Sequence, residues 1–299
     1  MVLTRRARSK EPAPASVADS VLRLAVLLQA GIVPAGAWRH LGESGDPAAL
    51  RVVAGIAAGE TVPEAILAGG GAWKDVAAAW EVATTVGAPL AESLRGLAEA
   101  LRDAHEAADD VRIALAEPAG SARLMLWLPV VGVALGSALG FETLRVLVGG
   151  PLGWACLVGG VGLLLLARRW TASLVRKAQP PAFIPGLHAE LVAIALSGGV
   201  SVERARRLVT AAPGSSPGPG DHIEPILALS RAAGVPAVDL LRASAASARH
   251  AARTEGRLRA SHLASKLLLP LGVCTLPAFL LLGVAPMMLS VLTTTPLSL

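Results

Sequence analysis

Two groups of charged side chains have the residue types and spacing that could do chemistry. The first is the acidic segment DAHEAADD at residues 103–110, in which a helix would place Asp103, Glu106 and Asp110 on one face. Carboxylates are ligands that a hard cation such as Ca²⁺ prefers. A solvated acidic face is the simpler interpretation of this segment, and we predict no metal site.

The second group is a row of four arginines: Arg242, Arg249, Arg253 and Arg257. Their spacing places them along one face of a helix. Guanidinium groups in such a row can dock an acidic protein surface, contact anionic lipid headgroups, or simply be solvated. The spacing alone leaves these alternatives open.

Motifs for catalysis and cofactor binding are absent from the sequence. GGGAWKD, residues 69–75, superficially resembles a phosphate-binding loop but lacks GxxxxGK[ST]. No HExxH motif occurs, and Cys156 and Cys274 lie far apart without metal-ligand spacing. We therefore expect no enzyme activity, no cofactor and no zinc.

The composition is typical of a membrane protein. The chain is 53% hydrophobic and 16% charged, whereas a soluble domain usually carries about 25% charged residues. Its net charge of +5 could favour nucleic acid, but there is no Tyr and there are only three Phe for stacking on bases. We expect contact with membrane lipid and not with nucleic acid.

Three uncharged runs are long enough to cross a bilayer. They predict transmembrane helices at 123–141, 146–167 and 267–293; the alternative, a buried hairpin of a large soluble protein, fits three such runs poorly. Most of the basic residues that flank the runs lie on one side: Arg123, Arg168, Arg169, Arg176, Lys177, Arg259 and Lys266; the other side has the short connection FETLR, with Glu142 and Arg145. The positive-inside rule makes that side cytoplasmic, with the N-terminus in the cytoplasm and the C-terminus outside.

Small residues and prolines mark the predicted spans. Gly132, Gly136 and Gly140 are spaced four apart, which favours close helix packing within the hairpin or against another subunit. Glycine is also simply common in membrane helices. Three prolines that can kink the helix lie in the third span: Pro270, Pro277 and Pro286. Kinked helices occur in transporters, so a small transporter or channel subunit is an alternative, although the uncharged runs lack the buried ionisable groups that transporters use.

Glycine and proline breaks divide the rest of the chain into helices. After a disordered tail at residues 1–16, a first cytoplasmic domain is expected at 17–122 and a second at 178–265. The helices predicted in the first domain are 17–30, 34–43, 47–57, 61–68, 73–86 and 89–117. Those predicted in the second domain are 187–197, 201–212, 222–233 and 236–265. In both domains the last helix runs into a predicted span.

The two predicted domains share an internal repeat. LLQAGIVPAGAW (27–38) aligns with ALSGGVSVERAR (195–206) at an offset of 168, and VGAPLAESLRGLAEALR (86–102) aligns with AGVPAVDLLRASAASAR (233–249) at an offset of 147. The second copy is therefore shorter by 21 residues (168 − 147), about one short helix pair. Gly31 pairs with Gly199 and Gly87 with Gly234, and we expect these four glycines to let the chain turn at helix ends rather than bind a ligand.

The order of these features resembles the GspF-like type II secretion F family. The resemblance is carried by the motif LLxxGxxxxxA from Leu27, the element GxPxxxxL from Gly87, their duplication, and the long helix that enters a span. The low charge and the Ala/Gly richness look most like the tight-adherence (Tad/Flp pilus) branch, TadB or TadC. The implied fold is an all-α membrane protein, with two repeated cytoplasmic helical bundles, the second shortened, on three transmembrane helices.

The resemblance also implies a function. Proteins of this family are inner-membrane platforms that couple a cytoplasmic hexameric secretion ATPase to the assembly of pilin subunits. The implied partners are that ATPase, a sister F-type platform subunit, pilin subunits and membrane lipid, within a homo- or hetero-oligomer. The arginine row would then be available to dock the ATPase or the sister subunit.

Overall fold

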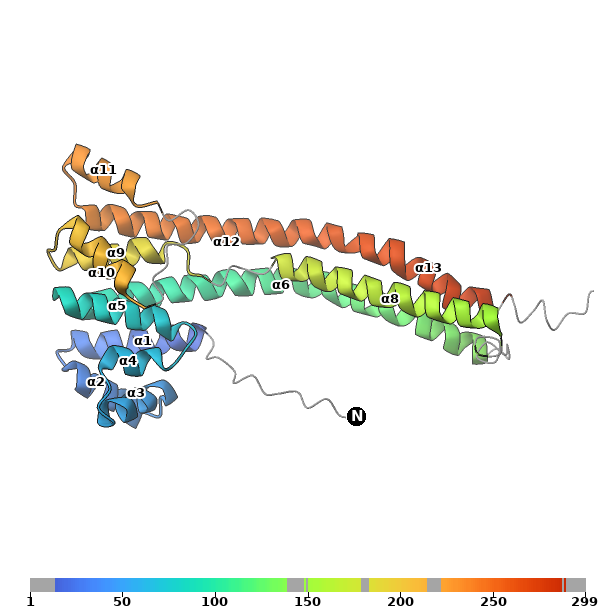
Figure 1. The fold of residues 1–299 in the computed structure, drawn as a ribbon, viewed down its shortest axis with the longest axis horizontal. Helices are drawn as coiled ribbons and strands as arrows, with labels where there is room; N and C mark the ends of the chain where they lie inside the picture. The colour runs from blue at the N-terminus through green and yellow to red at the C-terminus, as the bar shows by residue number, and fades with distance from the viewer. Residues whose placement is uncertain are drawn as a thin grey trace, which may run out of the picture. The chain divides into compact units, whose positions relative to one another are not determined.

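A computed structural model describes residues 14–138, 148, 150–178, 183–213, 222–286 and 288. All regular structure in these residues is helical (Figure 1). The chain divides into two compact units. The first contains residues 1–107 and 181–254, and the second contains residues 108–180 and 255–299.

The first unit is built from two stretches of chain. Its helices from the first stretch are α1 (Pro14–Gln29), α2 (Pro34–Glu43), α3 (Pro47–Ala57), α4 (Val62–Leu67), α5 (Trp73–Val86) and the start of α6 (Leu90–Ala138). Those from the second stretch are α9 (Leu187–Ser197), α10 (Val202–Ala211), α11 (Glu224–Ala233) and the start of α12 (Ala237–Pro270). Counterparts of α3 and α4 are lacking in the described part of the second stretch, where the repeat predicted a missing helix pair.

Local sequence signals account for where these helices begin. The Asp46 carboxylate accepts hydrogen bonds from the N–H groups of Ala48 and Ala49 at 2.9 and 3.0 Å, which caps α3 just before Pro47. Thr61 donates its hydroxyl and its N–H to Glu64 in the first turn of α4, and these bonds lower the pKa of the Glu64 carboxyl. The first helix begins at Pro14, so residues 14–16, expected in the disordered tail, are helical.

The four repeat glycines lie at helix ends. Gly31 and Gly199 have φ of 87° and 77°, and their N–H groups donate to the carbonyls of Leu28 and Leu196 at 3.0 and 2.9 Å. Gly87 and Gly234 follow α5 and α11 with φ of 72° and 67°. These left-handed conformations cost a residue with a Cβ about 1–2 kcal/mol, so each pair of equivalent positions has the same backbone requirement.

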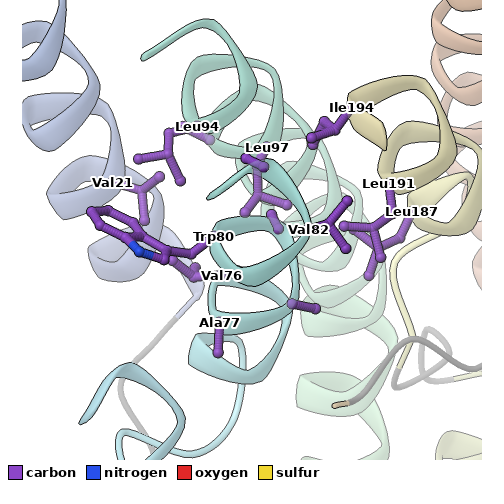
Figure 2. Close-up of a cluster of buried hydrophobic side chains, with 14 of the residues drawn as sticks. Val21, Val76, Ala77, Trp80, Val82, Leu94, Leu97, Leu187, Leu191 and Ile194 are labelled. Atoms are coloured by element: carbon purple, nitrogen blue, oxygen red, sulfur yellow. The ribbon is translucent and has the colours of Figure 1, made fainter. Parts of the chain in front are cut away.

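The core of the first unit is shared by both stretches of chain. Trp38 packs against Trp73 and Trp80, with ring centroids 6.2 and 5.9 Å apart. Helix α5 lies between α4 on one side and α9 on the other (Figure 1). Figure 2 shows Val82 of α5 beside Leu187 and Leu191 of α9. The two domains predicted at 17–122 and 178–265 thus contribute helices to one compact unit, in which α9 covers an apolar face of α5.

The second unit contains α8 (Pro151–Ala178), the remainder of α6 and α12, and an irregular helix after α12. This irregular helix consists of the π-helical turn η1 (Leu271–Thr275), α13 (Leu276–Phe279) and the π-helical turn η2 (Leu280–Val284), all of which pack against α8. The π turn η1 directly follows Pro270, and Pro277 lies in the first turn of α13. The proline-rich third run is thus irregular in its hydrogen bonding, as a helix interrupted by proline would be.

Close glycine packing in the second unit occurs at a position that the sequence analysis did not select. A Cβ on Gly160 of α8 would overlap the side chain of Leu282 in η2. Of the glycines predicted to pack, Gly132 and Gly136 lie in the part of α6 whose side-chain surroundings are outside the description, and Gly140 lies outside the described residues. Their packing role stays a prediction.

One helix among the described residues is long and apolar enough to cross a membrane, Pro151–Arg176. Its large apolar side chains are mostly exposed, for example Val158 at 63% and Leu152 at 62%. The apolar helix at Gly272–Val284 is shorter. The predicted spans at 123–141 and 267–293 include residues outside the description, and they stay predictions.

Candidate functional site

The acidic face of α6 and the arginine row of α12 contact each other in the first unit. Arg242 Nη1 donates to Glu92 Oε1 at 2.6 Å, Arg249 Nε donates to Asp103 Oδ2 at 2.9 Å, and Arg253 Nη1 donates to Glu106 Oε2 at 3.0 Å. We call these three pairs the ion-pair ladder. In the second unit, Arg257 Nη2 donates to Asp110 Oδ2 at 2.9 Å.

The ladder shows that α6 and α12 run parallel and side by side. Its partners are separated by 150, 146 and 147 residues, so a step toward the C-terminus of α6 is matched by a similar step along α12. The separation is close to the repeat offset of 147. Within the ladder, Arg253 and Glu106 occupy equivalent positions of the two repeat copies, and the other two pairs lie within three residues of equivalence.

The middle pair of the ladder extends into a buried charge cluster. Arg249 is only 10% exposed, and its Nη1 lies 3.9 Å from Oε2 of Glu190 in α9, whose side chain is 5% exposed. Burial raises the pKa of the Glu190 carboxyl, and the positive charges of Arg249 and Arg242 act in the opposite direction. Arg242 Nε is also 3.9 Å from Glu190. Three helices, α6, α9 and α12, thus meet at compensating charges.

The energetics of the ladder depend on this burial. Exposed ion pairs contribute only about 0–1 kcal/mol each, and Glu92 and Glu106 are 60% and 49% exposed. Breaking a buried pair by removing one partner costs about 3–5 kcal/mol, because the remaining charge stays buried without compensation. Removing Arg249 or Glu190 is therefore expected to lower the free energy of unfolding more than removing any other residue of this site.

The two charged groups selected from sequence are thus brought together. Asp103, Glu106 and Asp110 accept hydrogen bonds from arginines, so the acidic face is not simply solvated. The described residues hold no group of three or more His, Cys, Asp and Glu side chains arranged for a metal ion. The arginines have partners within the chain, and their docking to another protein stays a prediction.

Sequence reasoning missed two residues that shape the site. Glu190 is a carboxylate inside the apolar run LHAELVAIALS, and such an isolated charge could have indicated a buried ion pair. Gly96 of α6 leaves room for it, because a Cβ at Gly96 would lie 2.9 Å from Glu190 Oε1. The glycine had no local signal that distinguished it from the others.

A second carboxyl with a raised pKa lies away from the ladder, in the first turn of α5. Burial raises the pKa of Asp75 from 3.8 to about 6, although the neighbouring Lys74 lowers it. Asp75 lies in the GGGAWKD segment that superficially resembled a phosphate loop. Its perturbed pKa has a structural cause in burial, and the described residues give it no catalytic partner.

The chemistry of the site is that of structural ion pairing between long helices. Comparison with known proteins places the chain more narrowly: residues 21–137 match the family described as Type II secretion system (T2SS), protein F. This match runs from α1 into the apolar part of α6 and carries no match for the second repeat copy. Residues 21–137 are therefore similar to the protein F family of the type II secretion system. Neither the curated proteins nor the solved structures that were searched gave a match.

Proposed function

We propose that this chain is an inner-membrane platform protein of a type II secretion or Tad/Flp-type pilus assembly machine. The observation that carries the proposal is the similarity of residues 21–137 to the protein F family. The second stretch of the first unit, with its repeated glycine turns and its parallel long helix, supports the view that a shortened second copy of this domain is present.

The apolar helices of the second unit support a membrane location. Helix α8 is long enough to span a bilayer and exposes most of its large apolar side chains. In the proposal it is the second of three spans, with both repeat copies on the cytoplasmic side and the C-terminus outside. TadB and TadC are the sister roles that the composition favours.

Coupling to a secretion ATPase would use the long helices. Helix α6 continues without a break from Leu90 into the apolar part of the chain, and α12 continues likewise to Pro270. In the proposal, movement of the ATPase shifts the cytoplasmic helices, α6 and α12 carry the shift to the spans, and pilin subunits are moved in the membrane. The chain itself is proposed to catalyse no reaction.

Co-purification tests this function. The tagged full chain, solubilised from its own host, is expected to bring down a hexameric secretion ATPase and a sister protein F subunit. A matched control is the variant Arg249→Met, whose first unit is expected to be destabilised. Wild-type chain that binds neither protein, under conditions where it is folded, would contradict the proposal.

The transporter or channel alternative is less well supported. Transport of a polar substrate needs polar or ionisable groups along the path, and residues 151–167 and 267–286 contain no charged side chain. Substrate-dependent flux across the membrane of liposomes that contain the purified chain would support the transporter alternative.

A further inference from the structure

An apolar interface inside the first unit joins α5 to α9. Val82 of α5 is 1% exposed beside Leu187 and Leu191 of α9 (Figure 2). At the end of α9, Gly198 lies so close to Val86 that a Cβ on the glycine would be 2.7 Å from the Val86 carbonyl oxygen. This interface therefore joins the fifth helix of the first repeat copy to the first helix of the second copy.

Helix α11 is the counterpart of α5 at the repeat offset of 147. Its inward side follows the same pattern, because Ile223 and Leu227 are 3% and 5% exposed, like the equivalent Val76 and Trp80 of α5. Helices α5 and α11 thus bury equivalent side chains, each within its own repeat copy.

The outward side of α11 is open where that of α5 is covered. Leu229 is 55% exposed, although the equivalent Val82 is 1% exposed. Ala233 and Val235, equivalent to Val86 and Ala88, are exposed as well. Within the described residues, no helix covers the side of α11 that matches the α9-binding side of α5.

Helix α1 is the counterpart of α9 at the offset of 168. Some of its positions are exposed where the equivalent positions of α9 are buried. Leu24 and the equivalent Val192 are both fully buried. Val26, however, is 52% exposed, whereas the equivalent Ile194 is fully buried. Ala30, at the position of Gly198, is also exposed.

We propose that a second copy of this chain binds here, with α11 of one copy packed against α1 of the next. Both sides of the internal α5–α9 interface have counterparts at the two ends of the repeat, where Leu229 of α11 and Val26 of α1 are exposed and Asp19 of α1 accepts a hydrogen bond from Arg102 of α6. The contact is heterologous, so it produces a ring or an open row of copies rather than a symmetric dimer. This inference uses the repeat and the exposure of these helices, and it does not depend on a role in secretion.

The contact is expected to be reversible. At the positions of Leu187 and Leu191, α1 carries Asp19 and Arg23, so this interface is more polar than the internal one. More polar interfaces of modest size are typical of subunits that are stable separately.

Cysteine cross-linking between two differently tagged copies tests the proposal. The background lacks the native thiols of the second unit through Cys156→Ala and Cys274→Ala. One copy carries Ala30→Cys and the other Ala233→Cys, the equivalents of the Gly198 and Val86 positions that touch in the internal interface. Mild oxidation of membranes that contain both copies is expected to yield a mixed dimer, because disulfides form only between Cα atoms within about 7 Å.

Matched controls separate this contact from random collision. Ala54→Cys replaces a small residue of α3 that is also exposed, and its pairing with Ala30→Cys is expected to give only background product. Leu229→Asp is expected to reduce the mixed dimer to that background, whereas Leu50→Asp, at a similar exposure of 54%, is expected to leave it unchanged. Absence of the mixed dimer, or dimers formed equally well from Ala233→Cys copies alone, would overturn the proposal.

Discussion

Arg253 of α12 donates a hydrogen bond to Glu106 of α6 at 3.0 Å, and the two residues occupy equivalent positions of the repeat, 147 residues apart. One copy thus has a carboxylate where the other has a guanidinium group. Opposite charges favour pairing of unlike helices, while like helices would repel each other. The charge difference at this position therefore favours pairing of α6 with α12 in register.

Reversing both charges of this pair tests the register. Glu106→Arg or Arg253→Glu alone places like charges opposite each other and is expected to lower the free energy of unfolding by about 1 kcal/mol. The double variant is expected to recover most of this loss. Chemical unfolding of the detergent-solubilised full chain, followed by fluorescence of the buried tryptophans, measures the cycle; additive losses in the double variant would contradict the pairing.

Loss of the buried guanidinium group is expected to be more costly. Arg249→Met leaves the buried Glu190 with only Arg242 as a neighbouring cation and is expected to destabilise the first unit by about 3 kcal/mol. Adding Glu190→Gln removes the buried charge and should restore part of the stability. If Arg249→Met unfolds at the same denaturant concentration as the wild type, the buried charge cluster does not stabilise the fold.

The raised pKa of Asp75 predicts a pH dependence of stability. Because its pKa rises from 3.8 to about 6 on folding, the folded state holds the proton more tightly than the unfolded state. The stability that this proton contributes is fully present below about pH 4 and is lost as the pH rises through about 6.

Asp75→Asn removes this titration. The variant is expected to be more stable than the wild type at pH 7 and to show a flatter profile between pH 4 and 7. The same substitution at the exposed Asp239 serves as the control and should leave the profile unchanged. An Asp75→Asn profile parallel to that of the wild type would show that this carboxyl does not titrate in the window.

The contact of Gly160 with Leu282 predicts a position-specific effect in the second unit. Gly160→Ala is expected to force α8 and η2 apart and to cost about 1–3 kcal/mol through overpacking. Gly162→Ala, two residues away, meets no atom within 4 Å and should be neutral or stabilising, since Ala favours helix. Thermal unfolding in detergent distinguishes the two; equal effects would exclude a special contact at Gly160.

Local signals predicted most of the helices correctly. The bounds expected for α2, α3, α5 and α9 coincide with those observed, because proline at the first turn or glycine at the end marks most of these boundaries. These signals act over a few neighbouring residues, so they can be read directly from the sequence.

The charged faces show why the rest could not be predicted. Asp103 and Arg249 each had helical spacing within their own segment, but their contact joins residues 146 positions apart. It depends on α9 placing Glu190 beside Arg249, and no periodicity within one segment reports that packing. The alternatives for each face, cation binding or partner docking, were open for this reason.

Deletion of the gene in its own host tests the proposed function most directly. Surface filaments counted by electron microscopy, together with secreted pilin, are expected to be lost on deletion and restored by the wild-type chain. The Arg249→Met chain is expected to restore them poorly, while Gly162→Ala should restore them fully. A deletion strain with unchanged filaments and unchanged pilin secretion would contradict the role of this chain as an assembly platform.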